Sequence, residues 1–453
     1  MRIRRSIIGL VLVFIAFGFF FGCDITNITY PEDEPEQKFK VTFVTNGGSP
    51  VPAQQTVGYG DKVIPPPFMT KDGFGFIGWY KEAGYTNLWN FATGTVTSDI
   101  TLHARWVVPV NVPGVSLIDK LTWLTSNAQS DGYYVVEVAA NESIGPQSIS
   151  YPGRNNISIL LKGIGSVPII ISLSVNGSMF TIESGVTLIL DNMLELRGSN
   201  NLIQVKSGAT LILNSGVKIT GYLILDSVNN KGIFIMNGGE ISGDTSPYSS
   251  GGGVGNSYGI FTMYGGKISG NKGGGVDNSY GIFTMNGGEI SGNTHGVGNS
   301  YGIFTMNGGK IFGNTGNGGV GNFRGIFTMN GGEISGNSTT SHGGGGVHSD
   351  EGTFTMNGGV ISGNTARTYG GGVYMSSGVF NKTGGTIFGY SLGDSNSNAV
   401  KNSAGVVQPN TYGHTIYIQY YSVGSMSKYT TSGPGDNLSF DGNAYTWSGV
   451  WDY

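Results

Sequence analysis

A single phrase, Gly-Ile-Phe-Thr-Met-Asn-Gly-Gly-Glu-Ile-Ser-Gly-Asn, recurs with small changes between residues 232 and 364. Its first glycine falls at intervals of 27, 22, 21, 23 and 27 residues, at Gly232, Gly259, Gly281, Gly302, Gly325 and Gly352. A strand-like repeat of about 20 to 30 residues is typical of a solenoid, in which each coil stacks on the one before. The repeat therefore predicts an all-β solenoid that presents a long surface.

Three apolar positions recur in every repeat. Residues two apart on a strand point to the same face, so we expect the Phe and Met of each Phe-Thr-Met segment to point inward and the Thr outward. The Ile before Ser-Gly gives a third inward position. The columns are Phe234, Phe261, Phe283, Phe304, Phe327 and Phe354; Met236, Met263, Met285, Met306, Met329 and Met356; and Ile241, Ile268, Ile290, Ile311, Ile334 and Ile361. One coil cannot bury these side chains, so the coils must stack.

A charged residue precedes the inward Ile, and its sign alternates along five repeats: Glu240, Lys267, Glu289, Lys310 and Glu333. Like charges about 5 Å apart repel, whereas opposite charges on neighbouring strands contribute roughly 0.2–1 kcal/mol per pair. The alternation therefore favours parallel strands stacked in register.

Asparagine recurs at both corners of the repeat. The two series are Asn286, Asn307, Asn330 and Asn357, before Gly-Gly, and Asn271, Asn293, Asn314, Asn337 and Asn364, after Gly. Asn tolerates left-handed turn geometry, and its amide can hydrogen-bond to the same amide one coil away. We expect a structural role for both series; cation or sugar binding is the alternative. The calcium-binding nonapeptide repeat is not matched.

Less regular repeats extend toward the N-terminus, where segments that begin at Gly185 and Gly208 lie 23 residues apart. Each coil holds three short strands. The pattern resembles a right-handed parallel β-helix of the pectin-lyase-like type, to which we assign residues 133–390.

The two ends of a solenoid need caps. Residues 108–132 are expected to supply a helical N-terminal cap, which begins with a capping box formed by Ser116 and Asp119. Residues 391–453 are expected to form a last coil and an aromatic cap, with two tryptophans: Trp447 and Trp451.

Residues 38–107 read as a separate small unit. A strand is followed by the turn 46–48, an aromatic segment spans 76–80, and a strand over 100–106 closes the unit. These segments resemble the internalin-type B-repeat, also called the Listeria–Bacteroides repeat. The resemblance implies a β-grasp-like module of surface proteins without catalytic residues. Its tryptophans are expected to form the core, with a ligand platform as the alternative: Trp79, Trp89 and Trp106.

The N-terminus reads as an export signal, with a basic start, apolar residues 7–21, and then Gly22 and Cys23. The end of this stretch resembles a bacterial lipobox, which implies a signal peptide over 1–22 and a lipid, palmitate included, on Cys23. An uncleaved anchor helix and ordinary secretion are the alternatives. Residues 23–37 would form a flexible tether. We therefore expect a location in the cell envelope, facing the periplasm or the exterior.

Composition narrows the function. Charged residues are 11% of the chain and the net charge is −4, which does not provide the basic surface that nucleic acid requires. Cys23 is the only cysteine, so no intrachain disulfide can form. No catalytic signature occurs, and acids outside the alternating column, such as Asp277, read as isolated. We predict no catalytic residue, cofactor or metal; a site formed by His342 and His348 is the metal alternative.

Four aromatic residues lie just before the repeat glycine on successive coils: Tyr258, Tyr280, Tyr301 and Phe323. If exposed, they could stack sugar rings; packing against corner loops is the alternative. The sequence favours a monomeric, membrane-anchored lipoprotein that displays a non-catalytic surface for adhesion or for a protein or glycan ligand. The alternative is a carbohydrate-active lyase or hydrolase of pectin-lyase-like fold.

Overall fold

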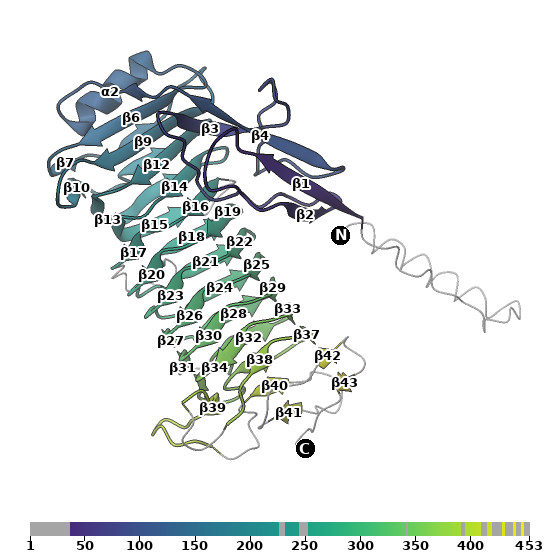
Figure 1. Ribbon diagram of the computed structural model, residues 1–453. Coiled ribbons are helices and arrows are strands. Elements are labelled where there is room, and N and C mark those ends of the chain that lie inside the picture. The colour runs from purple at the N-terminus through teal and green to yellow at the C-terminus, as the bar shows by residue number, and fades with distance from the viewer. Residues whose placement is uncertain are drawn as a thin grey trace, which may run out of the picture.

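The computed structural model describes residues 37–225, 232–243, 252–340, 343–390, 395–408, 415–418, 428–430, 438–440 and 445–447. These residues form a small mixed sheet, a parallel β-solenoid of about ten coils and one α-helix (Figure 1). The expected all-β solenoid, preceded by a small β module, is confirmed.

The small module is a four-stranded sheet in the order β2-β1-β4-β3. Its strands are β1 (Lys38–Val44), β2 (Gln55–Gly58), β3 (Gly75–Tyr80) and β4 (Ile100–Val107). The first and last strands pair in parallel at the centre, and both edge pairings are antiparallel. Trp79 and Trp89 are buried in its core, while Trp106 packs against it and donates from Nε1 to the Thr45 carbonyl at 2.8 Å. The expected core role of the tryptophans is confirmed.

The first face of the solenoid is a 14-stranded sheet that carries the Phe-Thr-Met segments. Its strands are β5 (Val110–Asn111), β6 (Tyr133–Val138), β9 (Ile157–Gly163), β12 (Val186–Asp191), β14 (Thr210–Leu213), β16 (Ile233–Met236), β19 (Ile260–Met263), β22 (Ile282–Met285), β25 (Ile303–Met306), β29 (Ile326–Met329), β33 (Gly352–Met356), β37 (Gly378–Lys382), β42 (Leu438–Phe440) and β43 (Tyr445–Trp447).

The second face carries the charged column, and the third follows it in each coil. The second-face strands are β7 (Glu142–Ile144), β10 (Ile169–Leu173), β17 (Glu240–Ser242), β20 (Lys267–Ser269), β23 (Glu289–Ser291), β26 (Lys310–Phe312), β30 (Glu333–Ser335), β34 (Val360–Ser362) and β38 (Thr386–Ile387). The third-face strands are β8 (Gln147–Ile149), β11 (Phe180–Ile182), β18 (Val254–Ser257), β21 (Val276–Ser279), β24 (Val297–Ser300), β28 (Val320–Phe323), β32 (Val347–Asp350), β36 (Val373–Met375), β40 (Ile416–Ile418) and β41 (Lys428–Thr430).

The second and third faces belong to one 21-stranded sheet, because two long strands pass through the corner between them. These are β13 (Leu194–Val205) and β15 (Val217–Leu225). A short four-stranded sheet forms at the same corner farther along, from β27 (Thr315–Gly316), β31 (Ser338–Thr339), β35 (Thr365–Ala366) and β39 (Ala399–Val400).

The coils stack in the register that the repeat predicts. Phe261 pairs with Phe283, and Phe283 with Phe304, and all the phenylalanines of the column are fully buried. Neighbouring rings from Phe234 to Phe354 are stacked, with centroids 4.7 to 4.8 Å apart. The Met and Ile columns are likewise fully buried in one continuous core.

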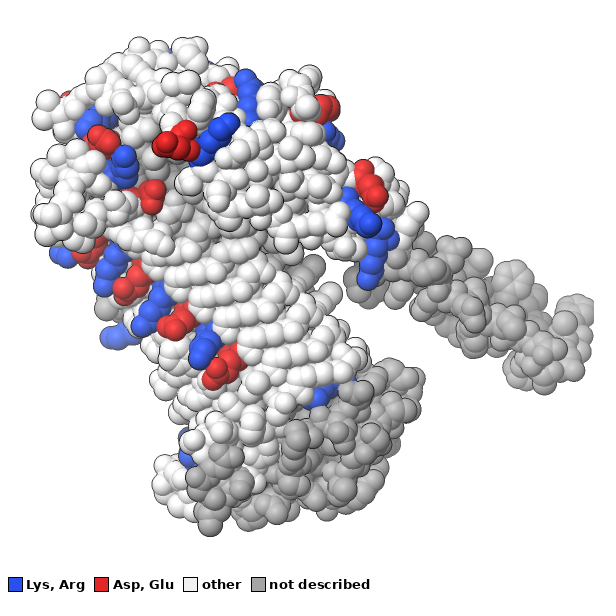
Figure 2. Space-filling model, in the orientation of Figure 1, with Lys and Arg blue, Asp and Glu red and all other residues white. Residues whose placement is uncertain are grey.

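The alternating charges are also confirmed, and the column is longer than expected. Glu195 pairs with Lys218, and Lys218 with Glu240, which places two more charges ahead of the predicted five. Figure 2 shows the column as alternating red and blue residues along one flank of the solenoid. The ammonium nitrogen of Lys310 lies 3.2 Å from a carboxylate oxygen of Glu333.

The expected helix, α2 (Leu117–Asn127), closes the N-terminal end of the solenoid (Figure 1). The Ser116–Asp119 capping box is present, and Leu117 and Leu124 are buried in the solenoid core. At the other end, Ile416 and Ile418 extend the core to a last coil. Trp451 and most of the expected C-terminal cap lie outside the described residues.

The module packs against the outer side of the first face, beside the N-terminal coils (Figure 1). One outward column explains where it sits. This column is apolar on the coils near the module and threonine on later coils: Val135, Leu160, Ile189, Ile212 and Ile235, then Thr262, Thr284, Thr305, Thr328 and Thr355. Ile189 and Ile212 belong to the buried cluster that includes Ile77 of the module. In this column, apolar side chains are therefore confined to the coils that the module covers.

Candidate functional site

Three of the four predicted aromatic residues form an exposed strip at the corner between the third and first faces. Tyr258, Tyr280 and Tyr301 are 48%, 52% and 41% exposed. Their rings stack on one another with centroids 5.0 and 4.9 Å apart and planes within 6°. We call these three residues the tyrosine strip. Tyr280 is stacked on both faces, and Tyr258 and Tyr301 on one face each, so the strip presents mainly ring edges and hydroxyl groups to solvent.

The register of Phe323 differs from the sequence expectation. Phe323 pairs with Ser300 on β24. The residue equivalent to Tyr301 on the next coil is therefore Arg324, which shares its positive φ angle. The sequence interpretation aligned Phe323 with the tyrosines because it is aromatic. The register is instead fixed by the repeat glycine, and Gly325 follows Arg324 as Gly302 follows Tyr301. Phe323 instead lies beside the strip, with its ring edge-on to that of Tyr301 at 5.6 Å.

The strip position carries an unusual backbone conformation. The φ angles of Tyr258, Tyr280 and Tyr301 are 62°, 55° and 54°, in the left-handed region. Residues with a Cβ atom enter this region at a penalty of roughly 1–2 kcal/mol, and Asn or Gly is its usual occupant. Arg324 and Glu351 hold the same conformation on the next two coils. The position therefore has a fixed backbone and a variable side chain.

A charged pair ends the strip. Arg324 donates to both carboxylate oxygens of Glu351, from Nε at 2.7 Å and from Nη2 at 2.9 Å. Its Nη1 donates to the Tyr301 hydroxyl at 2.8 Å. The hydrogen bonds to Glu351, and to a smaller extent the one to Tyr301, raise the pKa of Arg324 above its ordinary value. Two outward isoleucines of the adjoining first face, Ile303 and Ile326, are 43% and 42% exposed. The corner thus joins hydroxyl, apolar and ionic groups.

The asparagine series form amide rows, as expected, although the left-handed residues at the corners are glycines. Gly292 precedes Asn293 with φ 63°, and Gly288 follows Asn286 by two residues with φ 83°. The row through Asn293 is buried, whereas the row through Asn286 is exposed at Asn307, Asn330 and Asn357. A third row was not foreseen: Asn256, Asn278, Asn299 and Asn322. Its sequence signal is the recurrent Asn of the Val-x-Asn segment.

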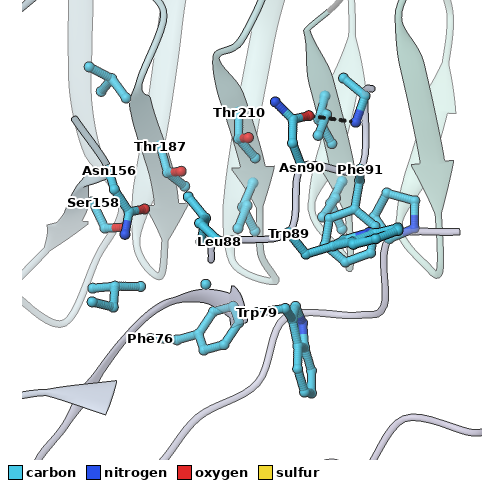
Figure 3. Close-up of a pocket in the computed structure, with 18 of the residues that line it drawn as sticks. Phe76, Trp79, Leu88, Trp89, Asn90, Phe91, Asn156, Ser158, Thr187 and Thr210 are labelled. Atoms are coloured by element: carbon cyan, nitrogen blue, oxygen red, sulfur yellow. Dashed lines mark hydrogen bonds between the residues drawn. The ribbon is translucent and has the colours of Figure 1, made fainter. Parts of the chain in front are cut away.

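A cavity of about 300 Å³ lies between the module and the solenoid (Figure 3). We call it the junction cavity. The module wall is aromatic and aliphatic, formed by Phe76, Trp79, Leu88, Trp89 and Phe91. The solenoid wall carries a row of hydroxyl side chains from β9, β12 and β14: Ser158, Thr187 and Thr210. Figure 3 shows Thr187 and Thr210 on neighbouring strands, facing Leu88 and Trp89.

Polar contacts hold the two walls together around the cavity. The Tyr264 hydroxyl donates to the Pro65 carbonyl at 2.6 Å. Arg105 of the module forms an ion pair with Asp131 at 2.9 Å, and Asn156 donates to Asp131 at 2.7 Å. The module is therefore docked through specific hydrogen bonds as well as apolar contact.

A second hollow, which we call the notch, lies on the third face and also measures about 300 Å³. Asp277, Gly298, Gly321 and His348 occupy the same position on four successive coils. The two glycines, which have no side chain, form the floor of the notch. Asp277 is not isolated, since one carboxylate oxygen lies 2.9 Å from Nε2 of His295. The Asp350 carboxylate lines the opposite end and accepts hydrogen bonds from the hydroxyls of Ser376 and Ser377.

Several sequence expectations fall on other parts of the chain. Cys23 and His342 lie outside the described residues, so the lipid anchor and the histidine pair stay predictions. In the part of the chain that the structure describes, no three His, Cys, Asp or Glu side chains are grouped to hold a metal ion. No helix in the same part combines the length and the apolar character needed to cross a bilayer.

Comparison with known proteins identifies the module. Residues 39–105 match the Listeria–Bacteroides repeat domain family. Two relatives come from Evansella cellulosilytica. The protein described as "Putative Gly-rich membrane protein" is 39% identical over 79 residues, and that described as "Putative membrane protein" is 37% identical over 82 residues. These alignments cover 17% and 18% of this chain, and 9% and 12% of the relatives. The chain thus spans only about a tenth of the relatives' length.

Proposed function

We propose that this protein is an extracytoplasmic lipoprotein, anchored to a bacterial membrane through Cys23, whose solenoid is a non-catalytic binding surface. The descriptions of its two relatives, which name a membrane protein in each case, and the Listeria–Bacteroides repeat support the envelope location. The ligand class that fits the tyrosine strip best is an extended glycan. Adhesion to a surface that carries such a glycan would be the biological outcome.

The observation that carries this proposal is the exposure of three tyrosines in a strained backbone conformation. Arg324 and Glu351 occupy the same position on later coils, so an aromatic residue is not needed for the coil to close. Asn or Gly would relieve the strain. Strain of this kind is found preferentially where side chains serve function. The tyrosines are therefore best explained by what they present to solvent.

The geometry suits a long ligand with regularly spaced polar groups. The strip repeats a phenol group once per coil, at ring spacings of 5.0 and 4.9 Å. An extended polysaccharide repeats its hydroxyl groups at a comparable spacing, so one chain could contact several coils. Ile303 and Ile326 would pack against its apolar C–H groups, and Arg324 would donate hydrogen bonds to its hydroxyl groups.

The test is glycan-array binding by the full-length protein in detergent, followed by binding to purified cell-wall polysaccharide. The variant is Tyr280→Asn with Tyr301→Asn, because Asn tolerates the left-handed conformation and the fold should be preserved. Tyr85→Asn is the matched control, since Tyr85 also has a positive φ angle, of 57°, and lies in the module. We expect the double variant to lose at least about tenfold in affinity, which corresponds to about 1.4 kcal/mol. Equal binding by parent and double variant would reject the strip as the site.

The notch supports a second candidate function, a polysaccharide hydrolase or lyase. Paired Asp277 and His295, with Asp350 at the far end, offer groups able to exchange protons with a bound sugar. Release of reducing ends or unsaturated products from a polysaccharide, abolished by Asp277→Asn or Asp350→Asn, would establish this activity. Turnover that survives both substitutions would exclude the notch as its source.

A further inference from the structure

The junction cavity has two chemically different walls. On the module side, Phe76, Trp79 and Trp89 present aromatic surface. On the solenoid side, Ser158, Thr187 and Thr210 occupy one outward column of the first face. An apolar ligand would be matched by apolar residues on both sides, whereas a sugar ring has apolar C–H faces and a hydroxyl rim. The two walls fit the two kinds of surface on a sugar ring.

The hydroxyl column departs from the pattern of the surrounding interface. The same column continues in register with Ile233 and Ile260, which are buried in the junction cluster. The neighbouring outward column carries Ile189 and Ile212 at the level of the cavity. Isoleucine therefore fits this interface, and it would fill the space that Thr187 and Thr210 leave. Three successive polar residues instead keep the cavity open and polar on one side.

Three hydroxyl groups and one indole N–H of the cavity wall lack hydrogen-bond partners among the described residues. Ser158 is 2% exposed, and no hydrogen bond joins its hydroxyl, or that of Thr187 or Thr210, to another described residue. Trp89 is 5% exposed, and its Nε1–H is buried without a hydrogen-bond partner in the described structure. A buried donor without a partner destabilises a fold by roughly 1–3 kcal/mol. Groups of this kind are explained when a ligand supplies the missing partners.

We propose that the junction cavity binds one small sugar ring, with its C–H face against the module aromatics and its hydroxyls toward Ser158, Thr187 and Thr210. A cavity of about 300 Å³ is at the small end of the range for ligand sites, which suits a monosaccharide. The site is separate from the tyrosine strip and does not depend on the function proposed for it. Because the sugar contacts both walls, its binding also stabilises the docked module.

The test uses the full-length protein in detergent with glucose, galactose, N-acetylglucosamine and myo-inositol as probes. Titration calorimetry measures binding, and tryptophan fluorescence reports it, since Trp79 and Trp89 line the cavity. The variant is Thr187→Val with Thr210→Val, which keeps the shape of both side chains and removes both hydroxyls. The matched control is Thr305→Val with Thr328→Val, outward threonines of the same face on coils beyond the module cluster.

We expect at least one probe to bind saturably, and the Thr187→Val and Thr210→Val pair to weaken it about tenfold or more, as loss of two hydrogen bonds implies. The control pair should bind as the parent does. Trp89→Phe, which keeps an aromatic ring and removes the Nε1 donor, should also weaken binding. The proposal is overturned if no probe binds, or if the valine pair binds the probe as well as the parent. Indole binding that improves in the valine pair, without sugar binding, would assign the cavity to apolar ligands instead.

Discussion

Asn278 donates from Nδ2 to Oδ1 of Asn299, 2.7 Å away on the next coil, and both side chains are completely buried. The same nitrogen also approaches the carbonyls of Gly281 and Ile303 at 3.1 and 3.2 Å. Each amide of this row therefore joins its own corner to the following coil. Buried polar groups are tolerated only when they are paired, so the row fixes the register of the stack as firmly as the apolar columns do.

Replacing a buried member of this row should be far more disruptive than replacing an exposed asparagine. Asn299→Ala removes the acceptor of Asn278 and leaves a small cavity, and we expect a loss of about 2–4 kcal/mol in the free energy of unfolding. Asn307→Ala, in the exposed row, should lose less than about 1 kcal/mol. Denaturant unfolding of both variants measures the difference. Equal losses would mean that burial of the row contributes nothing.

The alternating column predicts a salt-dependent effect. Lys310→Glu would place three acidic residues on successive coils, at 289, 310 and 333. We expect a loss of about 1 kcal/mol or less at low salt, because the side chains of Lys310 and Glu333 are 56% and 36% exposed to solvent. Salt should reduce the loss, since it screens exposed charges. Lys310→Gln is the control, and its unfolding free energy should depend less on salt. A loss that does not change between low and high salt would argue against repulsion.

Docking of the module should fail when a charge enters its interface. Ile212→Asp buries a carboxylate against the module, and we expect it to weaken docking by several kcal/mol. Thr305→Asp places the same charge in the same outward column on a later coil, where docking should be unaffected. Hydrogen exchange of β3 and β14 reports docking directly. Protection of both strands in Ile212→Asp would contradict the interface described above.

Two carboxylates should change stability with pH in opposite directions. Burial raises the pKa of Asp191, against hydrogen bonds from Asn192 and Asn214 and the charge of Lys162. Its ionised form therefore destabilises the fold above the folded-state pKa, and Asp191→Asn should be more stable than the parent at pH 7. The gain should shrink as the pH falls through that pKa toward the unfolded-state value.

Glu195 provides the opposite case. Its hydrogen bond from Arg197 holds its pKa below the ordinary value, despite partial burial. The stability it contributes is present above the unfolded-state pKa and is lost as the pH falls through the folded-state pKa. Glu195→Gln should therefore be less stable than the parent at pH 7 and equal to it in acid. Thermal unfolding of the parent and both variants, from pH 7 into acid, checks both residues. If the stability difference from the parent changed with pH in the same way for both variants, the assignment would be contradicted.

The lipid anchor gives the simplest cellular test. Cys23→Ser should move the protein from the membrane fraction to the soluble fraction and abolish palmitate labelling. Tyr85→Asn, which leaves the N-terminus intact, should stay with the membrane. A Cys23→Ser protein that remains membrane-bound would indicate another mode of attachment.

The sequence predicts the architecture well because its repeat is close to regular. The period reveals the inward columns, and the alternating signs set the register, which the structure confirms from Phe234 to Phe354. The error at Phe323 arose from following aromatic character across a coil, although the glycine that follows Arg324 fixes the position. The lipid anchor and the function of the tyrosine strip stay predictions.

The junction cavity could not be predicted, because it depends on how the module docks. The change from Ile235 to Thr262 in an outward column was nevertheless present in the sequence. It marks where this column changes from apolar to polar, and it becomes informative only when the coils are aligned. The third amide row was missed for a related reason, since a short polar segment with a regular Asn does not by itself show which way its side chains point.

The alternating column has a consequence for how such a protein can vary in length. Removing residues 281–301 would leave Phe261 stacked on Phe304, so the interior would tolerate the loss, yet Lys267 would then adjoin Lys310. Removing residues 281–324 would bring Lys267 against Glu333 and restore opposite neighbours. Replication slippage in the gene would therefore yield well-paired descendants when it gains or loses an even number of windings, and electrostatically mismatched ones when the number is odd.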